Sequence, residues 1–162
     1  GMDGNLIEAK MKDPKLGYFG ELTNINIQSV TDLLEKGYIP VISTLGCDKD
    51  GNAYNINADT AAAYIAGALK AERFILMTDI AGILKDKDDP NSLISEISLS
   101  EADKLFEMGV ISAGMIPKVQ CCVTAIKAGV KNVVIMDGRV PHSILMELLT
   151  KEGAGTLVKG DE

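Results

Sequence analysis

The chain has 162 residues, a length that fits a single domain. Hydrophobic residues make up 46% of it, which is enough for a buried core and excludes a disordered chain. The formal net charge of −7 argues against a nucleic-acid or anionic-membrane binder, because both partners attract basic surfaces. Aromatic residues make up only 4%, which disfavours a stacking platform for bases. We therefore expect a protein that acts on a small molecule.

The cysteine and histidine content favours a cytoplasmic protein without a metal centre of its own. Cys121 and Cys122 are adjacent and Cys47 is distant, which suits neither a zinc site nor a mutual disulfide, so we expect buried thiols. His142 is the single histidine and could not anchor a multi-histidine metal site. No apolar run reaches the roughly 18–20 residues of a membrane helix, and the N-terminus has no hydrophobic signal core. Gly1 ahead of Met2 is interpreted as a remnant of tag removal.

The first half of the chain alternates helical patterns with apolar runs. Apolar spacing predicts a helix over 27–36, which Gly37 ends, and then a short buried strand over 38–43. An Asp-Gly pair at 50–51 makes a hairpin plausible between two strands. An Ala-rich helix over 58–69 and a nearly unbroken apolar strand over 72–78 follow, and such a strand is usually covered on both faces.

The second half continues this alternation after a polar surface loop. Ser98 and Glu101 have the spacing of a capping box at the start of a helix. Pro117 is compatible with a later helix only in its first turn. The elements expected after the loop are the capped helix carrying Ala102, Leu105 and Phe106, a helix over 115–128, a strand over 132–136, a helix over 140–149 and a strand over 155–158.

The order of these elements predicts an α/β fold with a mostly parallel sheet sandwiched between helices, because strand–helix–strand units form right-handed parallel crossovers. Ligands of such sheets bind at the carboxyl ends of the strands. The loops after Ser43, Thr78 and Met136 are therefore the places to search for a site.

The first candidate segment is Asn55 to Asp59, at the start of the helix over 58–69. Asn57 is a natural helix N-cap, and Asp59 falls in the first turn, where the helix dipole favours an anion. This pattern is typical of simple capping. The short polar side chains of Asn55, Asn57 and Asp59 at alternate positions could equally hold a substrate and orient other groups.

Two further segments follow the same logic. Thr78 to Leu84 directly follows a buried strand, where Gly82 permits either a plain turn or the close approach of a ligand. Gly109 to Lys118 is a glycine-flanked loop that enters a helix. Lys118 would lie near the N-terminus of that helix, against the dipole, which is useful if an anionic phosphate completes the site. A solvated surface lysine is the alternative.

Several well-known catalytic motifs are absent from the sequence. It has no G-x-x-x-x-G-K-[ST] phosphate loop, no G-x-S-x-G elbow and no H-E-x-x-H motif. A single histidine also removes most acid–base schemes. Chemistry carried by positioning and charge remains, and phosphoryl transfer is the leading reaction of that type.

The runs NINADTAA, LMTDIAGIL and GVISAGMIPKV, followed by DGRVPHSILMELLTKEGAGTLV, resemble in order and spacing the carboxyl half of the acetylglutamate kinases, within the amino-acid kinase family. The opening GNLIEAKMKDPKLGYFGELTNIN also looks like the middle segment of those enzymes, so the resemblance runs from about Asp3 to Lys159. It implies an amino-acid kinase-like carboxyl-terminal lobe. Residues 1–26 would be the tag remnant and the central segment, and residues 27–162 the nucleotide-binding lobe.

The resemblance implies a role for each matching residue. Lys118 would stabilise the transferring phosphoryl group, Asp59 would organise catalytic lysines, and Asn55 and Asn57 would bind substrate. The arginine effector of inhibited relatives would bind His142, Glu147 and Gly153. No protein ligands to a metal are implied. The residues expected to contact the nucleotide are Thr78, Asp79, Ile80, Ala81, Gly82, Ile83, Leu84, Val110, Ile111, Ser112 and Met115.

The reaction implied is direct in-line transfer from ATP, with Mg²⁺, to the γ-carboxylate of N-acetyl-L-glutamate, in the cytoplasmic route to arginine. A carboxylate nucleophile needs no general base, so the scarcity of histidine is no obstacle. The family's amino-terminal half, with its phosphate-binding lysine and glycine turns, is not in these residues, so we expect the chain alone to be inactive. A homo-oligomer is expected, with no nucleic-acid or membrane partner. The alternatives are another amino-acid or carbamate kinase, or a non-catalytic nucleotide- or arginine-binding module that acts through a partner.

Overall fold

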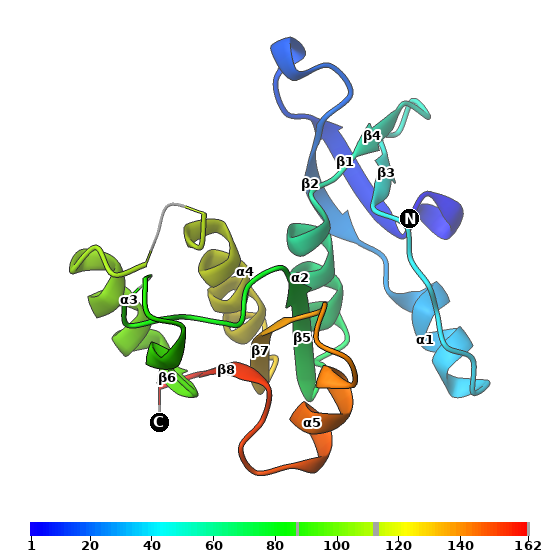
Figure 1. Cartoon of the computed structure of the whole chain (residues 1–162). Helices are drawn as coiled ribbons and strands as arrows, with labels where there is room; N and C mark the ends of the chain where they lie inside the picture. The colour runs from blue at the N-terminus through cyan, green and yellow to red at the C-terminus, as the bar shows by residue number, and fades with distance from the viewer. Residues whose placement is uncertain (87, 112–113, 162) are drawn as a thin grey trace. The chain divides into compact units, whose positions relative to one another are not determined.

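The computed structural model of the chain describes residues 1–86, 88–111 and 114–161. It forms two compact units, Gly1–Leu69 and Lys70–Glu162. Each unit combines a four-stranded sheet with helices, which confirms the α/β class (Figure 1). Within the described residues, no helix is long and apolar enough to cross a membrane.

Unit 1 has a sheet with the strand order β2-β1-β3-β4. β1 pairs with β2 in an antiparallel hairpin and with β3 in parallel, and β3 pairs with β4 in a second antiparallel hairpin. The elements of this unit are η1 (Asp3–Asn5), β1 (Ile7–Met11), η2 (Pro14–Leu16), β2 (Gly20–Ile25), α1 (Gln28–Glu35), β3 (Leu45–Cys47), β4 (Ala53–Asn55) and α2 (Ala58–Ala68).

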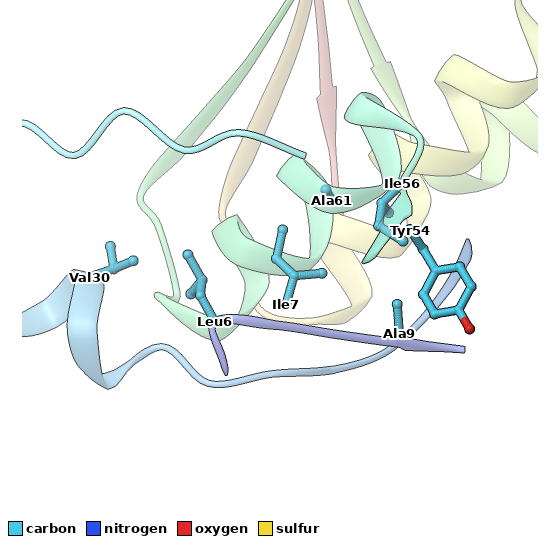
Figure 2. Packing of buried hydrophobic residues seen from close by; sticks show 7 residues of the cluster. All are labelled: Leu6, Ile7, Ala9, Val30, Tyr54, Ile56 and Ala61. Atoms are coloured by element: carbon cyan, nitrogen blue, oxygen red, sulfur yellow. The ribbon is translucent and has the colours of Figure 1, made fainter. Parts of the chain in front are cut away.

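Helix α2 and the two hairpins close the core of unit 1. Figure 2 shows Ile7 and Ala9 on β1 directed toward α2, which carries Ala61. Helix α2 begins at Ala58 because the side chain of Asn57, the residue before it, accepts a hydrogen bond from the Thr60 backbone N–H at 3.0 Å. The buried members of this core are Leu6, Ile7, Ala9, Val30, Tyr54, Ile56 and Ala61.

The β3–β4 hairpin that the Asp-Gly pair suggested is present. Gly51 has φ +84°, a left-handed conformation that glycine adopts without strain. The Asp48 carboxylate accepts hydrogen bonds from the Asn52 side chain and backbone N–H and from the Tyr54 hydroxyl, all at 2.9 Å. These bonds, the Asn52 side chain first among them, lower the pKa of Asp48 to about 2.

The strand expected over 38–43 is absent, and this prediction is wrong. Ile39 is 90% exposed and Val41 96% exposed. An extended segment becomes a strand only when a neighbour satisfies its backbone groups. Among the described residues of unit 1, the strand that follows α1 in the sheet is β3 instead.

Unit 2 has a sheet with the strand order β5-β7-β8-β6. The β5–β7 and β6–β8 pairs are parallel, whereas β7 and β8 are antiparallel. The elements of this unit are β5 (Arg73–Thr78), η3 (Pro90–Ser92), β6 (Glu96–Ser98), α3 (Leu99–Glu107), α4 (Ile116–Lys127), β7 (Asn132–Asp137), α5 (Ser143–Leu149) and β8 (Gly155–Lys159).

The predicted elements of unit 2 are all present, with two corrections. The capping box at Ser98 and Glu101 starts α3, and Pro117 lies in the first turn of α4, both as expected. The final helix begins at Ser143 instead of residue 140. Strand β5 lies at the edge of its sheet and leaves Met77 51% exposed, so it is not covered on both faces as expected.

The core of unit 2 centres on β7. Its residues 133–136 are fully buried, and α4 packs against this strand. Cys121 and Cys122 are buried on α4, and Cys47 is buried in unit 1, which confirms the expectation of buried thiols. The two sheets are each mixed, where the sequence suggested one mostly parallel sheet.

Candidate functional site

A pocket of about 210 Å³ in unit 2 brings together two of the candidate segments. One wall is the loop after β5 and the other comes from the residues that precede α4. The lining residues are Ile80, Ala81, Gly82, Ile83, Leu84, Val110, Ile111 and Met115. The two segments lie 26 positions apart in the sequence at their nearest, between Leu84 and Val110. Most lining side chains are apolar, as expected of a wall that packs against a planar ligand.

The loop after β5 is fixed by Thr156, which the sequence analysis missed. The buried Thr156 hydroxyl accepts a hydrogen bond from the Ile83 backbone N–H at 2.8 Å and donates one to the Ile94 carbonyl at 2.6 Å. Gly82 lies against the same hydroxyl with φ +148°, and a Cβ there would lie 2.5 Å from the Thr156 Oγ1 atom. Glycine is therefore required for this loop to approach β8.

Thr78 and Asp79 lie at the carboxyl end of β5, beside the end of β7. The Thr78 hydroxyl donates a hydrogen bond to the Asp79 carboxylate at 3.1 Å. Thr78 pairs with Asp137 across the parallel ladder, so polar groups of two strands meet at this edge. This is the place where open α/β sheets present ligand-binding groups.

Arg139 places a fixed positive charge at this edge and was also missed from the sequence. Its guanidinium binds the Asp137 carboxylate through two hydrogen bonds of 2.9 and 2.8 Å and donates to the Asp79 carbonyl at 2.6 Å. The Arg139 side chain and backbone N–H lower the pKa of Asp137 to about 2, and the Asp137 carboxylate raises the pKa of Arg139. The signal in the sequence was an Asp-Gly-Arg run directly after a buried strand.

Lys118 lies half-buried in the first turn of α4, three residues after Met115 of the pocket wall. The N-terminus of a helix attracts anions, and a lysine there adds a full positive charge. This position is compatible with the contact to a phosphoryl group that the resemblance implies, which stays a prediction. Ser112 falls outside the residues that the structure describes.

The predicted acceptor residues lie in unit 1. Asn55 is exposed at the end of β4, Asn57 caps α2, and Asp59 is half-buried in the first turn of that helix. Asn57 also lines a pocket of about 250 Å³ together with residues of the β1–β2 hairpin. Asp59 belongs to unit 1 and Lys118 to unit 2, so their joint catalytic role stays a prediction.

Glu147 and Gly153, two of the three residues predicted to bind arginine, lie together. The Glu147 carboxylate accepts a hydrogen bond from the Ala154 backbone N–H at 2.9 Å, and a Cβ at Gly153 would lie 2.7 Å from it. The guanidinium of Arg73 lies 3.4 Å from the other Glu147 oxygen. His142 is exposed at the N-cap of α5. Glu147 and Gly153 thus meet, and a guanidinium already contacts Glu147.

The next question is which side chains could hold Mg²⁺ among the residues that the structure describes. They include no group of three or more His, Cys, Asp or Glu side chains that could hold a metal ion. Mg²⁺ in phosphoryl-transfer sites is held mainly by substrate phosphates and water with one or two carboxylates, so such a group is not needed.

Comparison with known proteins relates the chain to a family. Residues 1–137 match the family model described as "Amino acid kinase family". The chain is 52% identical over 161 residues to the acetylglutamate kinase of Thermosynechococcus vestitus, covering 99% of this chain and 55% of that protein. The acetylglutamate kinase of Clostridium beijerinckii is also 52% identical, over 98% of this chain and 56% of that protein. The chain thus spans about half the length of the curated relatives it matches.

Solved structures agree on the fold. The smu.665 protein of Streptococcus mutans superposes with a TM-score of 0.76 and 34% identity, over 96% of this chain and 57% of that chain. The N-acetylglutamate synthase of Neisseria gonorrhoeae, in complex with coenzyme A and L-arginine, gives a TM-score of 0.81 and 26% identity, over 96% of this chain and 37% of that chain.

Proposed function

The chain belongs to the amino acid kinase family, and from that premise we propose that it is the nucleotide-binding half of an acetylglutamate kinase. The reaction would transfer the γ-phosphoryl group of ATP to the γ-carboxylate of N-acetyl-L-glutamate, in the cytoplasm. One observation carries the proposal. Two segments to which the resemblance gives a nucleotide-binding role line one apolar pocket, and Lys118 follows Met115 of its wall by three residues. The chain is about half identical to acetylglutamate kinases.

Each group of the chain has a physical task in this reaction. The apolar walls of the pocket, from Ile80 to Leu84 and at Met115, would hold the adenine base. The Lys118 ammonium, at the start of α4, would offset negative charge that builds up on the transferring phosphoryl group. Mg²⁺, bound with ATP, would neutralise the remaining phosphate charge.

The proposal is tested by Lys118→Ala in a protein that spans the full length of the relatives. We expect kcat to fall on the order of 10²–10³-fold with a much smaller change in the KM for ATP, because a contact made mainly in the transition state affects kcat. Lys127→Ala, at the other end of α4, is the matched control and should leave both constants unchanged. An unchanged kcat in Lys118→Ala, or no activity of the parent on acetylglutamate, would overturn the proposal.

We also propose that arginine is an effector bound at Glu147. The supporting observation is that Glu147 holds a guanidinium, that of Arg73, at 3.4 Å from one oxygen, while its second oxygen accepts the Ala154 N–H. Free arginine would take the place of the Arg73 guanidinium there. Carboxylates bind guanidinium groups through paired hydrogen bonds. Glu147→Gln in the full-length protein should raise the arginine concentration that gives half-inhibition, and unaltered inhibition would remove Glu147 from the effector site.

A further inference from the structure

Thr156 is a polar residue at a position of β8 where an apolar residue would fit. It is fully buried, and it pairs across the sheet with Ile135 of β7, which is fully buried too. Because β8 has a neighbouring strand on each side, β7 and β6, its backbone is held in the interior of the sheet. Valine has nearly the same shape as threonine and no polar atom to bury, so packing alone would favour valine here. The hydroxyl therefore has a role other than packing.

The Thr156 hydroxyl is inserted between two backbone segments that would otherwise pair directly. Ile94 donates its backbone N–H to the Ile83 carbonyl at 2.8 Å, as in an antiparallel pair of strands. In such a pair the Ile83 N–H would donate in return to the Ile94 carbonyl. Instead, the Ile83 N–H donates to Thr156 Oγ1 at 2.8 Å, and that hydroxyl donates to the Ile94 carbonyl at 2.6 Å. The hydroxyl thus acts as a spacer between the loop after β5 and residue 94.

This spacer determines where one wall of the 210 Å³ pocket lies. Ile83 lines that pocket and is itself buried, and Gly82 and Leu84 on either side of it also line the pocket. Without the hydroxyl, the Ile83 N–H and the Ile94 carbonyl either stay without a partner in the buried loop, which is unfavourable, or pair directly. Direct pairing moves the wall toward residue 94 and changes the width of the pocket.

We propose that Thr156 is a positioning residue for the nucleotide base, because its hydroxyl sets the distance between the two walls of the pocket. This inference rests on the proposed function, in which those apolar walls hold adenine. Among the described residues, Thr156 does not line the pocket itself, so it acts through Ile83. The hydroxyl therefore affects the affinity for the base and not the transfer of the phosphoryl group. Lys118 differs in this respect, since its charge acts on that group.

The test measures the Kd for adenosine and for ATP with Mg²⁺ by calorimetric titration of the chain and its variants. Thr156→Val removes the hydroxyl at constant volume and should raise both Kd values by the same factor, about tenfold, because the wall contacts the base and not the phosphates. Thr156→Ser keeps the hydroxyl and should stay within about threefold of the parent. Thr156→Ala should bind about tenfold more weakly than Thr156→Ser, a comparison that does not depend on the folding of Thr156→Val.

The matched control is Thr124→Val. It removes a hydroxyl that donates to a backbone carbonyl at 2.9 Å elsewhere in unit 2, on α4, and it should leave both Kd values unchanged. NMR of the ¹⁵N-labelled chain gives a second readout. The chemical shift and the hydrogen-exchange rate of the Ile83 amide should change in Thr156→Val and stay close to those of the parent in Thr156→Ser.

Kinetics separate this role from catalysis. In a protein that spans the full length of the relatives, Thr156→Val should raise the KM for ATP about tenfold and leave kcat within about twofold, the opposite of Lys118→Ala. Equal adenosine affinities in Thr156→Val and the parent, or in Thr156→Ala and Thr156→Ser, overturn the role of Thr156, and so does a loss of affinity confined to ATP. A parent chain that binds neither adenosine nor ATP overturns the proposed function instead.

Discussion

Gly82 occupies a position where the backbone, and not a side chain, makes the contact with β8. Its φ of +148° is one that residues with a Cβ rarely adopt. A Cβ there would also lie 2.5 Å from Thr156 Oγ1 and 3.0 Å from the Thr156 backbone N atom. Since the same hydroxyl holds the Ile83 N–H, crowding at Gly82 would displace the wall of the pocket proposed to bind nucleotide.

We therefore expect Gly82→Ala to weaken ATP binding by about tenfold or more and to lower the free energy of unfolding by about 1–3 kcal/mol. Calorimetric titration with ATP and urea unfolding measure the two effects. Gly51→Ala is the matched control, because Gly51 has φ +84° with open space around its Cβ position. Gly51→Ala should lower the free energy of unfolding through backbone strain and leave the affinity for ATP unchanged. Equal ATP affinity in Gly82→Ala and the parent chain would contradict this account of the loop.

The Asp137–Arg139 pair predicts how the stability of the fold depends on pH. The folded-state pKa of Asp137 is about 2, below its ordinary value of 3.8, so the pair stabilises the fold above about pH 4 and this contribution is lost as the pH falls toward 2. Asp137→Asn should lower the urea midpoint at pH 6, and its difference from the parent should shrink toward pH 2. The exposed Glu72→Gln is the control. If the urea midpoints of Asp137→Asn and the parent differ by the same amount at every pH, the Asp137 charge does not stabilise the fold in this way.

At the scale of residues, the sequence predicts turns and helix caps. It does not predict the residues, far away in the sequence, whose hydrogen bonds hold those turns in place. Gly82 and the cap at Asn57 are recognisable because turn and cap chemistry act within a few positions. Thr156 reaches the loop of Ile83 from 73 positions away, and Arg73 reaches Glu147 from 74. Such contacts depend on the tertiary fold, which hydrophobic periodicity does not encode.

At the scale of elements, periodicity and capping predict the helices well. Helices α1, α2 and α4 lie within about two residues of their expected ranges, the ordinary uncertainty of helix ends, and α3 begins at its expected capping box. The strand expected over 38–43 is absent. An apolar run indicates that a segment could be buried as a strand, but it does not identify a neighbouring strand that would pair with it. The odd positions of this segment carry the exposed Ile39 and Val41, and Pro40 and Ile42 between them are half-buried.

This exposed segment predicts self-association of the chain. Exposed apolar side chains favour association with another chain, because the association removes them from water. Val41→Lys should reduce the association, because it places a charge in this apolar surface, and should leave the circular dichroism spectrum unchanged. Sedimentation velocity at several concentrations measures this. Val140→Lys, at a 46% exposed valine of unit 2, is the matched control and should associate like the parent. Equal association in Val41→Lys and the parent would exclude this surface.

At the scale of the whole chain, composition and element order predict an α/β fold. They predict neither the direction of every strand nor the division of the chain into two compact units. The antiparallel β7–β8 pair forms because α5 and the turn before Gly155 bring the chain back beside β7, in the opposite direction. A Cβ at Gly155 would lie 2.7 Å from the Met136 Cβ, so glycine permits this close pairing. Nothing in the apolar pattern of 155–158 distinguishes that direction from a parallel one. The division into Gly1–Leu69 and Lys70–Glu162 likewise follows from contacts and not from a composition change.

The final prediction concerns the 162 residues taken as a separate polypeptide. We expect them to bind ATP, because both walls of the nucleotide pocket belong to unit 2, and to form no acetylglutamyl phosphate. Phosphoryl transfer depends on positioning both reactants, and the chain spans 55% of the length of its Thermosynechococcus relative. Calorimetry measures the binding, and trapping with hydroxylamine measures the acyl phosphate. The control is a protein that also carries the rest of the family's length, which should turn over under the same conditions. Robust turnover by the 162 residues alone would show that they hold a complete phosphate and acceptor site, and absent ATP binding would show that the pocket of unit 2 does not hold nucleotide.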